Sequence, residues 1–456
     1  MPTRRREGGS HLYVVRDLVN RSVLRWVSAV TVLLLLGLAW FALLPTPRAS
    51  ALFSQGVSVS PTGYDSYDQR VAVDRQADAA LVWVRKSRTY PYTWRVQFRS
   101  RSHTGAWGST INVSPSGQAP RSPKVVLDDD GDAVVVWDAY NGTDYHVYAR
   151  RVSRTGALGT LRVLTPGGVS IHGTDVAVDP DGDAVVTWAE WHSTGATFPM
   201  MRRYSRSGTL SAPVVLASSP ARADPPAVAL DRQGDAVLAW ANDWLVQART
   251  LSASGTLGPL RTVSADLSPI DRHFVARVTI NRDGDALVTW EHWTAADLST
   301  QIWGRWISRD GVVGAVRQLT PSSHTDMSNY SVSSDLDGDV MLTWDLFPSA
   351  NLYARRISRT GTIGQPVLVS IYGRLHTVRI DDDGDGVVVW QRKGTDNIVS
   401  SVGARRVTSS GTFGTAQVVA SNGRYPTTAV SPTGRALVAW ERQFQVDLMI
   451  QASVGP

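Results

Sequence analysis

Short runs of β-branched and other apolar residues alternate with polar, glycine-containing turns along the chain from residue 71 onward. One 13-residue pattern recurs without gaps, as in VVLDDDGDAVVVW and VAVDPDGDAVVTW: an apolar run, an Asp-rich turn, and a second apolar run that ends in tryptophan. Its last residue is Trp83, Trp137, Trp188, Trp240, Trp290, Trp344, Trp390 and Trp440. Eight copies at a period of about 50 residues predict a repeat architecture rather than separate domains.

Each unit is predicted to hold four short strands, here called a, b, c and d in chain order. Strands a and b flank the Asp-x-x-Gly turn, and strand c leads into a second turn of the form Ser-x-x-Gly, as in RRVSRTGALG around Gly156. Glycine stands where a tight hairpin requires a positive φ, and Asp or Ser stands where a side chain can cap the turn. No segment outside the N-terminus shows a convincing helical period.

Eight four-stranded units predict an all-β fold, an eight-bladed β-propeller that spans residues 52–456. The last unit ends after its third strand, whereas residues 52–61 have the pattern of an isolated fourth strand. Because an unpaired strand edge is unfavourable, we expect residues 56–60 to pair with residues 448–453 and close the eighth blade. The alternative is an open solenoid of the same units.

These repeats resemble those of exported bacterial β-propeller proteins. The period is similar to that of kelch repeats, but Gly167-Gly168 is the only glycine pair in the body of the chain. Trp137-Asp138 and Trp344-Asp345 resemble the dipeptide of WD repeats, which the other six units lack. The Asp-box of sialidases is absent from the sequence. The resemblance therefore implies the propeller fold and no particular activity.

The N-terminus has the features of an export segment. Residues 26–44 form an almost wholly apolar stretch behind an arginine-rich segment. Ala49-Ser50-Ala51 matches a signal-peptidase site, and the apolar stretch is also long enough to span a bilayer. We expect residues 1–51 to be a signal peptide or an uncleaved membrane anchor. The propeller is expected outside the membrane in both cases, because the positive charge precedes the apolar stretch.

Composition and charge exclude several function classes. The chain has no cysteine, which excludes disulfides, thiolate metal sites and a cysteine nucleophile. Its net charge is +6, but residues 1–51 hold seven arginines and only two acids, so the propeller is nearly neutral and nucleic acid is not an expected partner. The sequence contains no Gly-x-Ser-x-Gly elbow, phosphate loop or dinucleotide fingerprint, so no catalytic residue is assigned.

In five units the first turn carries an oxygen-bearing side chain at alternate positions. Three such oxygens on a glycine turn can hold calcium, but the bidentate Glu that completes an EF-hand is missing. The favoured interpretation is an Asp-capped hairpin turn in water, with no cofactor. The weak calcium candidates are Asp128, Asp130, Asp132, Asp381, Asp383 and Asp385.

A further expectation concerns an ion pair inside each blade. Seven units carry an Arg three residues before the turn Ser or Thr, as at Arg150, and an Asp where strand b begins, as at Asp132. The eighth unit lacks both residues. Since the start of strand b lies beside the end of strand c in an antiparallel pair, we expect the two side chains to meet.

The b–c and d–a connections vary in length, whereas the two glycine turns are constant. Strand alternation places these variable connections together on one face. Acidic and aromatic residues gather there just after the repeat tryptophan, and rings beside carboxylates suit sugar binding, although such rings also pack between blades. The predicted ligand-binding residues are Tyr140, Glu190, Trp191, His192, Asp243, Trp244, Glu291, Trp293, Asp345 and Phe347.

The sequence thus predicts an extracellular, non-enzymatic recognition module that binds a glycan or a protein on the b–c/d–a face. The alternative is a glycan-active hydrolase or lyase with a carboxylate site at the propeller axis. Carboxylates with raised pKa that converge on a central pocket would favour the enzyme, and exposed rings over shallow clefts would favour binding.

Overall fold

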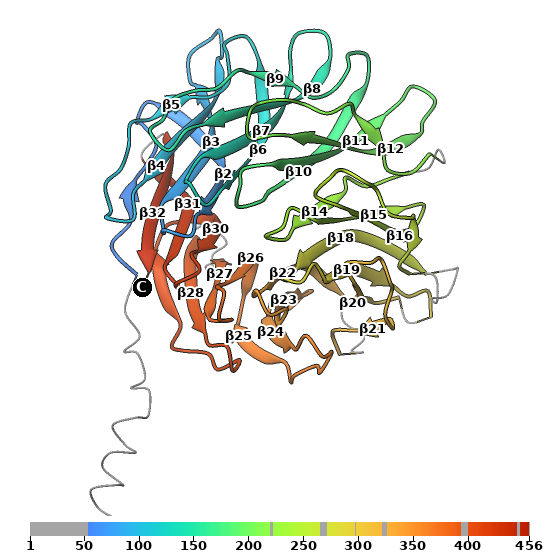
Figure 1. Ribbon diagram of the computed structural model, residues 1–456. Coiled ribbons are helices and arrows are strands. Elements are labelled where there is room, and N and C mark those ends of the chain that lie inside the picture. The colour runs from blue at the N-terminus through green and yellow to red at the C-terminus, as the bar shows by residue number, and fades with distance from the viewer. Residues whose placement is uncertain are drawn as a thin grey trace, which may run out of the picture. The chain divides into compact units, whose positions relative to one another are not determined.

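The computed structural model describes residues 53–218, 222–264, 271–296, 298–321, 326–393, 400–444 and 447–455. In this part the strands form eight four-stranded sheets, which are arranged as the blades of a propeller (Figure 1). The eight-bladed propeller predicted from the repeats is confirmed. The predicted export segment, residues 1–51, lies outside the described residues. In the described ranges, no helix has the length and apolar character needed to cross a membrane.

One strand of each blade lies innermost, around the propeller axis (Figure 1). These strands are formed by the first apolar run of each unit, strand a of the sequence. They are β2 (Tyr64–Val73), β6 (Ala119–Leu127), β10 (Ser170–Val178), β14 (Ala227–Leu230), β18 (Arg272–Ile280), β22 (Met327–Ser334), β26 (Gly373–Ile380) and β30 (Arg424–Val430).

The second strand of each blade contains the repeat tryptophan. Its first half is almost entirely buried, because both faces of a blade pack against neighbouring blades. These strands are β3 (Ala79–Ser87), β7 (Ala133–Tyr140), β11 (Ala184–Trp191), β15 (Ala236–Asn242), β19 (Ala286–Trp293), β23 (Val340–Leu346), β27 (Gly386–Lys393) and β31 (Ala436–Phe444).

The third and fourth strands complete each blade toward the outside. The third strands are β4 (Trp94–Arg101), β8 (Tyr145–Val152), β12 (Thr197–Tyr204), β16 (Leu245–Leu251), β20 (Thr300–Ile307), β24 (Leu352–Ile357), β28 (Ser400–Val407) and β32 (Asp447–Gly455). The outermost strands are β5 (Ile111–Asn112), β9 (Arg162–Val163), β13 (Val214–Val215), β17 (Arg261–Thr262), β21 (Arg317–Gln318), β25 (Val367–Ser370), β29 (Gln417–Ala420) and β1 (Val57–Ser58). Outer strands this short leave little exposed edge for pairing with another chain.

The N-terminal strand closes the ring, as expected. Strand β1 pairs antiparallel with β32, with Val57 opposite Ala452 and Ser58 opposite Gln451. The backbone N–H of Val59 donates to the carbonyl oxygen of Ile450 at 2.8 Å. The first described strand therefore joins the last blade, and the open solenoid is excluded for the described chain.

The hydrophobic core consists of eight clusters between successive blades. Trp137 packs against Val82 and Val96 of the preceding blade, and Trp188 packs against Val136 in the same way. The repeat tryptophans are all buried. Each tryptophan thus fixes one blade against the blade before it, which explains why it recurs in every unit.

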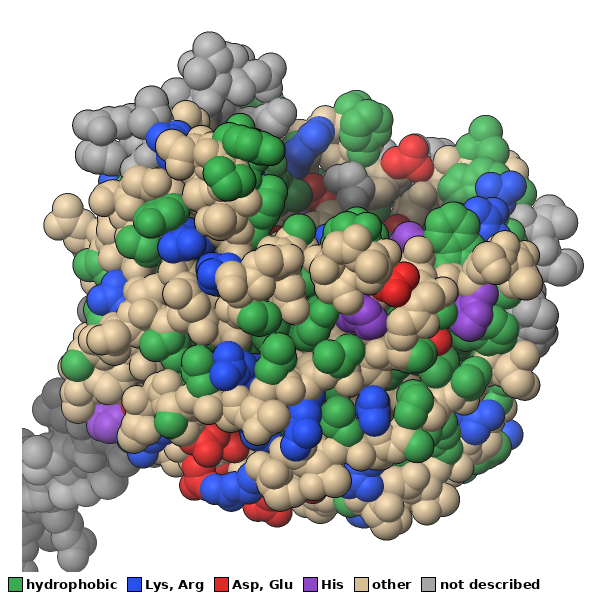
Figure 2. Space-filling view, turned by 90° about the horizontal axis from the view of Figure 1, so that it is seen from above, with side chains coloured by type: hydrophobic (Ala, Val, Ile, Leu, Met, Phe, Trp, Pro, Cys, Tyr) green, Lys and Arg blue, Asp and Glu red, His purple; other side chains and the backbone are tan. Residues whose placement is uncertain are grey.

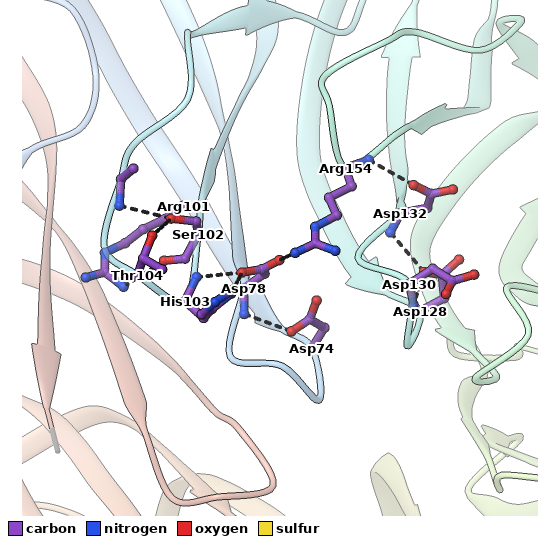
Figure 3. A network of polar contacts seen from close by, with 11 residues as sticks. Asp74, Asp78, Arg101, Ser102, His103, Thr104, Asp128, Asp130, Asp132 and Arg154 are labelled. Carbon is purple, nitrogen blue, oxygen red and sulfur yellow. Dashed lines mark hydrogen bonds and ion pairs between the residues drawn. The ribbon is translucent and has the colours of Figure 1, made fainter.

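The a–b and c–d turns lie together on one face, which we call the Asp-turn face. In the second blade, Asp128 Oδ1 accepts hydrogen bonds from the backbone N–H of Asp130 at 3.1 Å and of Asp132 at 2.9 Å. Asp132 Oδ1 in turn accepts from the backbone N–H of Arg154 in the c–d turn at 2.8 Å (Figure 3). The last bond recurs in all seven units that have a c–d turn. The two turns of a blade are therefore held together by the Asp that opens strand b.

The turn glycines also bring neighbouring blades together. Gly182 has a φ of +90°, and a Cβ there would lie 2.7 Å from Asp128 Oδ2 of the preceding blade. The next turn glycine, Gly234, has the same relation to Asp179 at 2.9 Å. Glycine is thus required twice, for the positive φ of the turn and for the close approach to the carboxylate.

The predicted ion pair between Arg150 and Asp132, and its equivalents, is wrong. Among the described residues, none of the seven arginines forms an ion pair with the Asp of its own unit. Arg150 instead donates to the carbonyl oxygens of Gly159, at 2.8 Å, and of Val113 in the preceding blade, at 3.0 Å.

The reason for this error is the strand register. Arg150 lies opposite Val135, three residues beyond Asp132, and an odd offset along a strand places two side chains on opposite faces. In the sixth unit, Arg355 is the equivalent of Arg150. The next residue along the strand, Arg356, does pair with Asp339. The eighth unit lacks both residues because it has no c–d turn to cap; its outer strand comes from the N-terminus.

Candidate functional site

The b–c and d–a connections lie on the face opposite the Asp-turn face, and we call it the variable face. Eight aromatic side chains in the described ranges are strongly exposed, and all of them lie in these connections or at the adjoining strand ends. They are Tyr90, Tyr92, Tyr140, Trp191, Trp244, Phe347, Tyr372 and Tyr425. Figure 2 shows hydrophobic side chains gathered around a hollow at one edge of the molecule. The aromatic surface of the propeller is thus confined to one face.

Four of the rings predicted to bind a ligand are exposed rather than buried between blades. The exposed fraction is 48% for Trp191, 43% for Trp244, 52% for Phe347 and 39% for Tyr140. Trp293 is half-buried. The competing expectation, that these rings pack between blades, is therefore wrong for these four residues.

The predicted carboxylates differ from this pattern. Glu190 is buried, and one of its oxygens accepts from the indole N–H of Trp188 at 2.8 Å. Its other oxygen lies 3.6 Å from Nε2 of His192. Glu190 and Trp188 are two residues apart on β11, so their side chains share a face that turns into the core. Glu190 is therefore a core acceptor rather than a surface ligand.

Asp345 and Asp243 also have internal partners. Asp345 is 1% exposed and lies 3.9 Å from Nε2 of His376. Asp243 accepts a hydrogen bond from the backbone N–H of Arg222 at 3.0 Å. The expectation that Glu190 and Asp345 would meet a ligand at the surface is not met, because both side chains are buried and have partners inside the propeller.

One cluster of rings around a cation lies between the fourth and fifth blades. The guanidinium of Arg272 lies 5.0 Å from the ring centre of Trp244 and 5.5 Å from that of Trp293. Phe274 contacts Trp244 edge to face, at 5.2 Å between ring centres. A cation between two indole rings holds both of them in place. The ring cluster, defined as these four residues, is a rigid aromatic surface.

The backbone explains how Trp244 reaches the surface. Asp243 and Trp244 form the two-residue link between β15 and β16, with φ values of 47° and 68°. Positive φ at both positions is typical of a type I′ hairpin turn, in which Gly usually occupies the second position. Tryptophan at that position is strained, and strain of this kind tends to persist at functional sites.

Sequence reasoning missed Arg272 and Phe274. Both lie on β18, which follows a d–a connection of variable length, so no repeat position marks them. Only the strand register, with Arg272 opposite Trp293 and Phe274 opposite Glu291, brings them to the predicted residues. No signal in the sequence would have found them.

Glu291 is the one predicted carboxylate with unusual electrostatics. Burial raises its pKa to about 7, Arg277 opposes that rise, and the acids Asp224 and Asp345 add to it. Burial also raises the pKa of Asp224. A carboxyl group of this pKa can carry a proton near neutral pH, which is the property that a general acid requires.

The inner strands carry a second feature that the sequence did not reveal. The register of seven of them shifts by a β-bulge six to seven residues before the Asp turn. Val275 and Leu375 adopt φ values of 48° and 47° at their bulges, and both side chains are exposed. A β-branched residue at positive φ is a conformational outlier.

The axis itself contains a cavity of about 750 Å³, lined by residues of the inner strands of all eight blades. This volume lies within the range of small-molecule sites in proteins. None of the predicted site residues lines the cavity. The ring cluster and the axial cavity are therefore two distinct regions of the propeller.

Two of the weak calcium candidates, Asp128 and Asp381, are turn-capping groups. Asp128 and Asp381 each bind backbone N–H groups of their own turn through one carboxylate oxygen. The carboxylate of the exposed Asp130 pairs with Arg206 of the next blade at 2.5 Å. Within the described ranges, no three His, Asp or Glu side chains converge as metal ligands would. The arrangement is that of the Asp-capped turn.

No protein-family model matches the sequence, and no curated protein is significantly similar to it. Among solved structures, the chain is similar to a lectin from Burkholderia pseudomallei, with 12% identity, a TM-score of 0.51, and coverage of 78% of this chain and 100% of the lectin. It is also similar to a protein of unknown function from Dyadobacter fermentans, with 10% identity, a TM-score of 0.44, and coverage of 90% and 99%. An α-L-arabinanase from Penicillium chrysogenum has 11% identity, a TM-score of 0.41, and coverage of 73% and 92%. At these identities the likeness to the lectin concerns the fold alone.

Proposed function

We propose that the protein is an exported, non-enzymatic recognition module that binds a glycan on the variable face. The observation that carries this proposal is the confinement of all strongly exposed aromatic side chains of the described chain to that face. Aromatic rings stack on the apolar faces of sugars, and loops on a rigid scaffold are where binding residues usually lie. Export rests on residues 1–51 and is part of the same proposal.

The ring cluster is the proposed centre of the site. Arg272 fixes Trp244 and Trp293, so little side-chain entropy is lost when a sugar stacks on the exposed ring. The polar sugar hydroxyls would meet Arg272 and the backbone of the Asp243 turn. The lectin of similar fold supports the proposal only in that a propeller scaffold is compatible with glycan binding.

The test uses the full chain on a glycan array, followed by titration of the strongest-binding oligosaccharide. Trp244→Ala is expected to lower the affinity about tenfold, since a stacked ring contributes about 1–2 kcal/mol. The matched control is Val312→Ala, which removes an exposed apolar side chain from the Asp-turn face and should leave binding unchanged. Equal affinities of the two variants, or the absence of any bound glycan, would contradict the proposal.

A glycan hydrolase is the second candidate, and Glu291 is the observation that favours it. Hydrolysis needs a protonated carboxyl group and a second carboxylate on the other side of the scissile bond. Glu291 has the raised pKa, with Asp224 and Asp345 as the nearby acids. Incubation of the bound oligosaccharide with wild type and with Glu291→Gln distinguishes the two: recognition predicts no cleavage by either protein, and hydrolysis predicts cleavage that Glu291→Gln abolishes.

A further inference from the structure

The axial cavity is strongly cationic, although the propeller as a whole is nearly neutral. Of the charged side chains that line it in the described chain, four are cationic and one is anionic. The cations are Arg70, Lys124, Arg277 and Arg379, and the anion is Asp175. Like charges inside a cavity repel one another, so gathering these cations carries an electrostatic cost.

Three of the cations lie at one level of the channel. Arg70, Lys124 and Arg277 each stand four residues before the first Asp or Asn of their a–b turn, and each lies opposite the residue that precedes the repeat tryptophan. Arg379 stands two residues before its turn Asp, closer to the Asp-turn face. The repeat geometry thus directs charges from four different blades into one space, although they are far apart in sequence.

Two of the cations have nearby acids. Lys124 pairs with Asp175 at 2.7 Å, and Arg70 lies 3.7 Å from Asp68. The remaining two, Arg277 and Arg379, form no ion pair within the described residues. Arg277 packs its guanidinium on the ring of Tyr330 at 4.8 Å, and its Nε is buried without a hydrogen-bond partner in the described chain.

Arg379 is the most unusual of these side chains. It is exposed, yet desolvation by the surrounding protein lowers its pKa, the like charge of Arg277 lowers that pKa further, and Asp175 opposes the fall. Its one described hydrogen bond is from Nη1 to the carbonyl oxygen of the adjacent Val378, at 2.8 Å. Because Arg379 lines the cavity, the water it meets is the water of the channel.

We propose that the axial channel is an oxyanion site, in which Arg277 and Arg379 bind a sulfate, phosphate or carboxylate group. Guanidinium groups present planar pairs of N–H donors that match these oxyanions, and such charge-assisted bonds are the stronger ones in proteins. Ser331 and Thr377, which line the same part of the cavity, add hydroxyl donors. The site is separate from the ring cluster, so it does not depend on the glycan proposal.

The source of the oxyanion is a free ion or a charged group on a sugar, and the test includes both. The full chain is titrated calorimetrically with sodium sulfate, sodium phosphate, glucuronate and N-acetylglucosamine 6-sulfate, at constant ionic strength. Uncharged N-acetylglucosamine serves as the negative probe. Tighter binding of the inorganic ions identifies a free anion as the ligand, and tighter binding of the charged sugars identifies a sugar-borne group; both results support the site.

Arg379→Gln is the decisive variant, because its side chain makes only one described hydrogen bond and its loss relieves repulsion. We expect the variant to fold and to bind the anions about tenfold more weakly, since a hydrogen bond to a charged group contributes this much. Arg359→Gln is the matched control; it removes one positive charge from an exposed c–d turn on the other face. Arg277→Gln provides a second, independent loss.

A thermal melt makes the same test without calorimetry. Sulfate should raise the melting temperature of wild type and of Arg359→Gln, and it should raise that of Arg379→Gln much less. Equal sulfate responses in Arg379→Gln and Arg359→Gln, or wild-type binding that disappears at constant ionic strength, would overturn the proposal. A failure here would leave binding of an uncharged glycan at Trp244 unaffected, so the two proposals fail separately.

Discussion

The two faces of the propeller are built by the same strands and differ in almost every other respect. On the Asp-turn face, the units repeat nearly the same bonds. A side-chain oxygen caps the a–b turn, from Asp in six units, from Asn281 in the fifth and from Ser431 in the eighth. In seven units the turn glycine packs on the capping residue of the preceding blade. On the variable face, the connections differ in length, and all strongly exposed rings of the described chain lie there. Constancy on one face and variation on the other indicate that the first face maintains the ring and the second is available for recognition.

The two faces also differ in how their side chains affect stability. On the Asp-turn face, side chains cap backbone N–H groups in each blade, and Arg154 adds an ion pair to Asp78 of the preceding blade at 2.9 Å (Figure 3). The variable face instead contains positive φ at bulky residues such as Trp244 and Val275, and apolar rings in water. One face holds neighbouring blades together through repeated contacts, and the other accepts strain and exposure, as binding sites often do.

The largest expected loss of stability comes from a mutation in the core between blades. Trp188→Ala should lower the free energy of unfolding by about 3–5 kcal/mol, because it removes a fully buried indole between two blades. Denaturant-induced unfolding followed by circular dichroism measures this loss. A loss below about 1 kcal/mol would show that the blades do not depend on the repeat tryptophan.

Two glycines of the third blade, one on each face, allow a direct comparison of how much stability each face contributes. Gly182 and Gly195 both have positive φ, at +90° and +85°, but a Cβ at Gly182 would meet Asp128, and a Cβ at Gly195 would meet nothing within 4 Å. Gly182→Ala should cost about 2–3 kcal/mol of unfolding free energy, and Gly195→Ala about 1 kcal/mol, the cost of the φ alone. Equal melting temperatures for the two variants would contradict the interblade role of the turn glycine.

The Asp-turn face should also impose a pH dependence. Burial raises the pKa of Asp381 to about 6 from its ordinary value of 3.8. The folded chain then binds a proton more readily than the unfolded chain between these values, so stability is highest below pH 3.8 for this group and falls as the pH rises through 6.

Asp381→Asn removes this titration while retaining the cap, because Asn281 caps the fifth unit in the same way. The variant should be about 1–2 kcal/mol more stable than wild type at pH 8 and lose this advantage near pH 4. Urea unfolding across this pH range measures the difference, with the exposed Asp383→Asn as the control. Parallel pH profiles for wild type and Asp381→Asn would refute the assignment.

The smallest effect on stability is expected on the variable face. Trp191→Ala removes an indole three residues from Trp188 on the same strand, but its ring is 48% exposed. The free energy of unfolding should change by less than about 1 kcal/mol. A loss comparable to that of Trp188→Ala, in the same denaturant experiment, would mean that Trp191 is a packing residue and not a surface available to a ligand.

Much of the fold could be predicted because its determinants are local. The Asp-x-x-Gly and Ser-x-x-Gly turns select tight hairpins by their backbone requirements, and period-2 runs of β-branched residues select strands. The missing fourth strand at residue 456 and the spare strand at residues 56–60 identified the closure. The ion pair of Arg150 with Asp132 failed for a local reason as well, since the actual register places Arg150 opposite Val135, three residues from Asp132.

By itself, the sequence determined the eight units, the closure of the ring and the face on which rings gather, because turn chemistry and side-chain period act over a few residues. Only the tertiary structure decided that Glu190 and Asp345 turn inward and that Arg272 lies between Trp244 and Trp293. It alone decided that Arg70, Lys124, Arg277 and Arg379 share one cavity. These residues come from different blades, and their distances depend on how eight sheets pack around an axis, which no local pattern encodes.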